Sequence, residues 1–248
     1  MKTEDITLRE EIVVGISILA EKYLQDRTLY IDVILNILKK AGEYLPETVW
    51  YKLIQVITND GALQAYAAKT AFEALETSHF DEKLVKVVGY ILGEFGNLIA
   101  GDSEFSPIFQ LRLLYSNFYL CTNDTKTTLL TTFMKFANIY PNIVAEIKQI
   151  FRINIHNIDS EVQQRAVEYL KLCEIAHPET LRRVFEKMPQ YQKETCVEEA
   201  LQNMQIGTSE INPLKKLKLK GSESCTALSK QYNVESKTLK KYVSYTNI

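Results

Sequence analysis

Four basic side chains lie close together near the C-terminal end of this 248-residue chain: Lys215, Lys216, Lys218 and Lys220. Clustered ammonium groups can attract the anionic headgroups of a membrane surface, with about 1 kcal/mol for each charge. A lysine-rich segment with few large apolar residues is also typical of a solvated tail without a partner. The lysine run is therefore a candidate for weak contact with an anionic membrane, and the solvated tail is the simpler interpretation.

The charge of the chain is divided unevenly between its two parts. Residues 207–248 carry eight lysines and three glutamates, a net charge of +5. The preceding residues carry 21 basic and 28 acidic side chains, a net charge of −7. An acidic body repels the phosphate backbone, so the distribution argues against nucleic acid as a partner.

The metal-ligating residue types do not form a site in the sequence. The three histidines are far apart and fall near the ends of predicted helices, at His79, His156 and His177. A zinc hydrolase helix needs two histidines four residues apart, and this sequence lacks that spacing. The cysteines also lack the C-x-x-C spacing of zinc and redox sites, and we expect thiols at Cys121, Cys173, Cys196 and Cys225. We expect no metal, no cofactor, no small-molecule substrate and no enzymatic activity.

Two groups of glycines resemble binding motifs. Gly96 and Gly101 have the spacing of a phosphate-binding loop, but Asp102 stands where that loop needs a lysine. A carboxylate there would repel a phosphate, so the motif fails. Gly89 and Gly93 form a G-x-x-x-G pattern, which in a water-soluble helix indicates close packing against another helix more often than a ligand site.

Helical periodicity extends from the N-terminus to about Met188, and no proline falls inside a predicted helix. Every second helix is predicted to start near one of five residues: Thr7, Pro46, Asp81, Thr122 and Ser160. These starts are separated by 39, 35, 41 and 38 residues. A period of about 40 residues with two helices is typical of HEAT and armadillo repeats. We therefore predict an all-α, right-handed α-solenoid of about ten helices over residues 1–206, followed by a mobile or weakly helical tail over residues 207–248. An irregular helical bundle is the alternative.

The first predicted helix is apolar nearly all round. We expect its main stripe to face the core, at Ile12, Ile16, Leu19 and Tyr23. Val14 and Ile18 then lie on the far side. Terminal repeats normally have a polar outer face, so the chain reads as if it began in the middle of a longer solenoid.

Targeting signals are absent from the sequence. The sequence contains no stretch of about 18 or more apolar residues, which is the length that a helix needs to cross a bilayer. The N-terminus is polar and partly acidic, unlike a signal peptide. We expect a cytoplasmic protein.

Several segments resemble, in order, the trunk of alpha-adaptin, the large alpha subunit of the plasma-membrane clathrin adaptor complex. The likeness covers most of residues 8–189 and is carried by Ile18–Tyr23, Tyr30–Ile57, Ala65–Leu75, Leu84–Asp102 and Val162–Leu172. The resemblance is to the C-terminal half of that trunk. No lipid, cargo or accessory-protein site of the family is carried over to a residue of this chain.

The resemblance implies a non-catalytic scaffold in endocytosis and vesicle-mediated protein transport. It implies an α-solenoid that binds a small sigma subunit, a large beta subunit and a medium mu subunit, in a coat that selects cargo and recruits clathrin. It also implies a cytoplasmic protein held peripherally on the plasma membrane at clathrin-coated pits. The alternatives are a free-standing helical-repeat module that binds other proteins, and a fragment without function.

Overall fold

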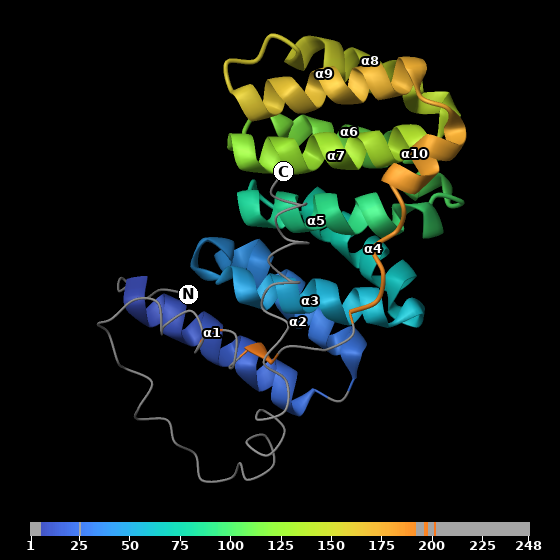
Figure 1. Cartoon of the computed structure of the whole chain (residues 1–248). Coiled ribbons are helices and arrows are strands. Elements are labelled where there is room, and N and C mark those ends of the chain that lie inside the picture. The colour runs from blue at the N-terminus through green and yellow to red at the C-terminus, as the bar shows by residue number, and fades with distance from the viewer. Residues whose placement is uncertain (1–5, 25, 192–195, 198–200, 202–248) are drawn as a thin grey trace, which may run out of the picture. The chain divides into compact units, whose positions relative to one another are not determined.

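The computed structural model describes residues 6–24, 26–191, 196–197 and 201, and within them every regular element is a helix (Figure 1). The α-helices are α1 (Ile6–Tyr23), α2 (Arg27–Ala41), α3 (Glu47–Asn59), α4 (Gly61–Glu76), α5 (Glu82–Phe95), α6 (Pro107–Phe118), α7 (Asn123–Ile139), α8 (Val144–Asn154), α9 (Ser160–Ile175) and α10 (Pro178–Val184). Short 3-10 turns join some of them, at Gly42–Tyr44, Gly96–Leu98, Ser103–Phe105 and Pro141–Ile143. The all-α class is thereby confirmed. The lysine run and the predicted boundary at residue 206 lie outside the described residues and stay predictions.

The helices form two rows, as a solenoid requires. The odd-numbered helices α5, α7 and α9 pack against one another in sequence order, and Figure 1 shows them in front of α4, α6 and α8. Each even-numbered helix packs against the next odd one, so the pairs are α2 with α3, α4 with α5, α6 with α7 and α8 with α9. The five predicted starts fall within one residue of the first residues of α1, α3, α5, α7 and α9. The predicted repeat period and the solenoid are confirmed.

The helix predicted to start near Ser160 does begin at that residue, and Asp159 before it is the cap of α9. Its Oδ1 accepts the backbone N–H groups of Glu161 and Val162 at 3.1 and 3.0 Å. A carboxylate is a stronger acceptor for these helix N–H groups than a hydroxyl, because it is charged and faces the positive end of the helix dipole.

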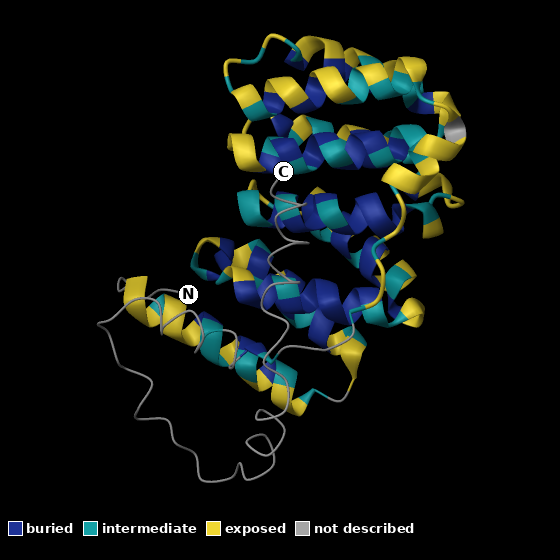
Figure 2. Cartoon of the chain, in the orientation of Figure 1, coloured by how far each residue is buried: buried dark blue, intermediate teal, exposed yellow. Residues whose placement is uncertain are grey.

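The core lies between the two rows and consists mainly of aliphatic and phenylalanine side chains (Figure 2). Its largest fully buried members include Leu84, Phe118, Phe133 and Phe151. Gly89 and Gly93 bring α5 close to α7, and the hydroxyl of Thr132 donates to the carbonyl of Gly89 at 2.9 Å. The expected packing role of these glycines is therefore what the structure shows.

Polar contacts join neighbouring repeats at separations close to the repeat period. Glu82 of α5 accepts the backbone N–H of Thr122 at 2.9 Å and the hydroxyl of Thr125 at 2.7 Å. Burial opposes ionisation of Glu82, but these hydrogen bonds outweigh it and lower the pKa of Glu82. Arg165, which is 4% exposed, donates to the carbonyl of Thr127 on α7 at 3.2 Å. Because such contacts recur, each odd helix is fixed to the next by side chains as well as by apolar packing.

The expected orientation of α1 is wrong. Val13, Ser17 and Ala20 face the neighbouring helices and are buried, whereas the predicted inward stripe faces solvent. Val14 and Ile18, the predicted far side, are half-buried. Both faces of α1 are apolar, so the hydrophobic pattern could not decide between them. The small side chains of Ser17 and Ala20 allow close packing.

Candidate functional site

The histidines and the glycine loop do not come together as a reactive centre. His79 lies between α4 and α5, His156 between α8 and α9, and His177 caps α10 by accepting the N–H of Glu179. Within the described residues there is no group of three His, Cys, Asp or Glu side chains able to hold a metal ion. Gly96 faces the buried side chain of Gln110, which donates to the Gly96 carbonyl at 3.0 Å. This part of the chain therefore packs against α6.

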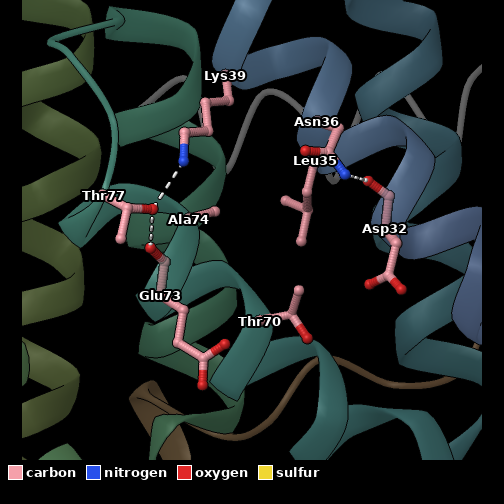
Figure 3. A pocket seen from close by; sticks show the side chains of 8 residues that line it. All are labelled: Asp32, Leu35, Asn36, Lys39, Thr70, Glu73, Ala74 and Thr77. Carbon is pink, nitrogen blue, oxygen red and sulfur yellow. Dashed lines mark hydrogen bonds between the residues drawn. The ribbon is translucent and has the colours of Figure 1, made fainter.

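A shallow cavity of about 260 Å³ lies between α2 and α4 (Figure 3). Several of its polar groups form hydrogen bonds within and between the two helices. Lys39 Nζ donates to Thr77 Oγ1 at 2.7 Å, and that hydroxyl donates to the carbonyl of Glu73 at 2.6 Å. The carboxylate of Asp32 accepts the hydroxyl of Tyr66 at 2.8 Å. Since the lining residues fasten α2 to α4, we interpret the cavity as a packing feature.

The exposed face of α1 is a better candidate for binding. It carries an apolar series that we call the α1 stripe: Leu8, Ile12, Ile16, Leu19 and Tyr23. The spacing of four, four, three and four residues places these side chains on one side of the helix. Their exposed fractions range from 37% for Ile12 to 71% for Tyr23. A continuous apolar face of this kind fits an amphipathic helix of another protein.

We expect the α1 stripe to cause self-association of the isolated chain. Each buried isoleucine or leucine contributes about 1.5–3 kcal/mol, so Ile16→Glu together with Leu19→Glu should abolish the association. Sedimentation velocity over a concentration series measures it. The control is Ile175→Glu, which changes a side chain on α9 that is 77% exposed and lies outside the α1 stripe. A wild-type chain that stays monomeric at its highest soluble concentration would contradict this expectation.

A second surface runs along the C-terminal ends of the odd-numbered helices. It consists of four polar side chains that we call the helix-end row: Glu21, Asn59, Glu94 and Lys135. Glu21 pairs with Lys52 at 3.6 Å, and Lys135 donates to the carboxylate of Glu94, whose side chain is 3% exposed. Sequence reasoning missed this row, because each member is an ordinary polar residue by itself. Their separations of 38, 35 and 41 residues follow the repeat period and were the available signal.

The described cysteines lie in the body of the chain as thiols. Cys121, Cys173 and Cys196 form no disulfide among the described residues, and burial raises the pKa of the Cys121 thiol to about 11. A raised pKa keeps the thiol protonated and unreactive.

Among the described helices, none is long and apolar enough to cross a membrane.

Comparisons with known proteins agree with the arrangement of the helices. The family model of the adaptin N-terminal region matches residues 1–177. The chain is 39% identical over 191 residues to AP-2 complex subunit alpha-2 of Dictyostelium discoideum, which covers 77% of this chain and 19% of that protein. It is 34% identical over 187 residues to AP-2 complex subunit alpha of Schizosaccharomyces pombe, covering 75% of this chain and 21% of that protein. It is 35% identical over 176 residues to AP-2 complex subunit alpha-1 of Arabidopsis thaliana, covering 69% of this chain and 17% of that protein. The chain spans about a fifth of the length of these relatives.

Proposed function

The chain belongs to the family of the adaptin N-terminal region, and on that premise we propose that it is a non-catalytic scaffold in a clathrin adaptor complex. The similarity to alpha subunits of AP-2 complexes over three quarters of the chain carries the proposal. The paired helices support it, because α-solenoids present extended surfaces to other proteins. The proposed processes are endocytosis and vesicle-mediated protein transport.

The proposed partners are the sigma, beta and mu subunits of the adaptor complex. The α1 stripe is the surface we assign to this assembly, with an amphipathic helix of the complex as its occupant. Such a contact buries apolar area that is exposed in the isolated chain, which favours association. The proposed location is the cytoplasmic side of the plasma membrane at clathrin-coated pits, with peripheral attachment through the complex.

The test is purification of the tagged chain from its native cell under gentle conditions, followed by mass spectrometry of the proteins that accompany it. We expect sigma, beta and mu subunits in near-equal amounts. The Ile16→Glu, Leu19→Glu chain should recover less of them, because a charged side chain cannot enter an apolar contact without losing its hydration. The Ile175→Glu chain serves as the control and should recover them as the wild type does.

The absence of all three subunits from a well-expressed wild-type sample would contradict the proposal. Recovery of other proteins in their place would support the alternative, a free-standing helical-repeat module. An unchanged yield of subunits from the Ile16→Glu, Leu19→Glu chain would show that the α1 stripe does not bind these subunits. It would not contradict the proposed adaptor function.

A further inference from the structure

After α10 the chain turns back and crosses the C-terminal ends of odd-numbered helices. We call the described part of this segment the strap; it comprises residues 185–191 together with Cys196 and Val197. The ring of Phe185 packs against that of Tyr169 on α9, with centroids 5.9 Å apart. Figure 1 shows the segment passing from α10 along α5 towards α3. The strap thus crosses several repeats in the direction opposite to their order in the sequence.

The helix-end row holds the strap by its backbone. The N–H of Tyr191 donates to Asn59 Oδ1 at 2.7 Å, and Asn59 Nδ2 donates to the carbonyl of Tyr191 at 3.3 Å. One asparagine amide therefore satisfies both backbone groups of one residue. The N–H of Met188 donates to Glu94 Oε2 at 3.4 Å, and the N–H of Val197 donates to Glu21 Oε2 at 2.9 Å. Met188 and Tyr191 lie outside any helix, and recognition of this kind suits such an extended peptide, because its backbone groups lack helical partners. Val197, in contrast, lies in helical backbone.

The strap passes from one odd-numbered helix to the next within a few residues. The N–H of Met188 contacts Glu94 on α5, and three residues later the N–H of Tyr191 contacts Asn59 on α3. An extended chain rises about 3.3 Å per residue, so these two contacts are separated by roughly 10 Å of chain. The described part of the strap therefore meets a hydrogen-bonding side chain on each of α5, α3 and α1.

Two of the residues held by their backbone also anchor the strap by their side chains. Val197 is 1% exposed. Tyr191 is half-buried beside Tyr90, and burial raises the pKa of Tyr191 and that of Tyr90. Tyr191 follows Pro189 by two residues, and a proline favours extended backbone at the residue before it. At α3 the strap therefore combines backbone recognition with an aromatic anchor.

We propose that the helix-end row is a binding site for extended peptides and that the strap is its internal ligand. The partner it fits is a segment of another protein with a proline and, two residues later, an aromatic side chain. The strap competes with such a segment at an effective concentration of about millimolar, because it is attached to the same chain. A partner peptide gains access when the strap is weakened or displaced.

The test measures binding of a fluorescent peptide with the sequence of residues 185–197 to the full-length chain by anisotropy. The wild-type chain should bind it weakly. Tyr191→Ala removes the aromatic anchor of the strap and should raise the affinity at least about tenfold, because competition by the internal ligand falls. Adding Asn59→Ala to Tyr191→Ala should return binding to the wild-type level or below.

The matched control adds Asn36→Ala to Tyr191→Ala, because Asn36 lies on α2 and donates to the carbonyl of Asp32 at 2.9 Å. This chain should bind the peptide as tightly as Tyr191→Ala alone. Equal binding by the wild-type and Tyr191→Ala chains would overturn the proposal, as would tight binding that persists after Asn59→Ala.

Hydrogen exchange tests the same binding site in the absence of added peptide. The amide of Tyr191 should be protected in the wild-type chain and should exchange faster after Asn59→Ala, while the amides of α7 stay unchanged. Equal exchange at Tyr191 in the two chains would show that Asn59 does not hold the strap and would overturn the proposal.

Discussion

We expect Gly89→Val to lower the free energy of unfolding by about 3 kcal/mol, because the larger side chain forces α5 and α7 apart. A Cβ atom at this position would lie 2.6 Å from Leu129 Cδ2. Leu129 is fully buried, so its methyl group cannot move aside without disturbing α7. Separation of the helices would also break the hydrogen bond from Thr132 to the carbonyl of Gly89.

The matched substitution is Gly15→Val in the interior of α1, where the added Cβ meets no atom of another element within 4 Å. Both changes replace a helical glycine by the same residue, so their difference isolates the contact between helices. We expect Gly15→Val to change the free energy of unfolding by less than about 0.5 kcal/mol. Urea titrations of the two variants and the wild type measure this difference. Equal midpoints for both variants would contradict the packing role of Gly89.

The sequence was sufficient for the features that depend on local structure. Helix starts follow from prolines, capping residues and apolar periodicity, and all five predicted starts of the odd-numbered helices fall within one residue of the observed ones. The packing of Gly89 and Gly93 against α7 follows from the small size of glycine. The helix-start signals are read from a few neighbouring residues, so they can be recognised without knowledge of distant parts of the chain.

The inward face of α1 could not be predicted in the same way. Ile12 and Val13 are equally apolar, yet Ile12 faces solvent and Val13 is 1% exposed. The choice depends on the shape of the surface that α1 meets, where Ser17 allows close approach and its hydroxyl donates to the carbonyl of Val13 at 2.8 Å. A hydrophobic pattern measures polarity and contains no information on this fit.

The helix-end row was missed for a different physical reason. Asn59 contacts Tyr191, which lies 132 residues further along the chain, and it contacts the backbone of that residue. A contact between residues so far apart in sequence, made to the backbone, cannot be recognised from the residue types near Asn59 or Tyr191. Only the comparison of equivalent positions in successive repeats shows that Glu21, Asn59 and Glu94 occupy related places.

The ion pair between Lys135 and Glu94 gives the other large effect. Lys135→Met removes the cation that pairs with the carboxylate of Glu94. The side chain of Glu94 is 3% exposed, so its charge would then be buried without a partner. Breaking a buried ion pair by removing one partner costs about 3–5 kcal/mol. The side chain of Lys135 is 19% exposed, so the pair is partly solvated and we expect the lower end, about 3 kcal/mol. Urea denaturation of the variant measures this loss.

The double variant Glu94→Leu, Lys135→Met separates the penalty of an unpaired charge from the contribution of the ion pair. Removing both charges leaves no buried ion, so the double variant should be more stable than Lys135→Met alone by at least about 1 kcal/mol. It also loses the acceptor of the Met188 N–H, so the strap should exchange its amide hydrogens faster at that residue. If the loss of stability in the double variant equals the sum of the losses measured for Glu94→Leu and Lys135→Met alone, the two side chains act independently of each other, and the ion pair does not stabilise the chain.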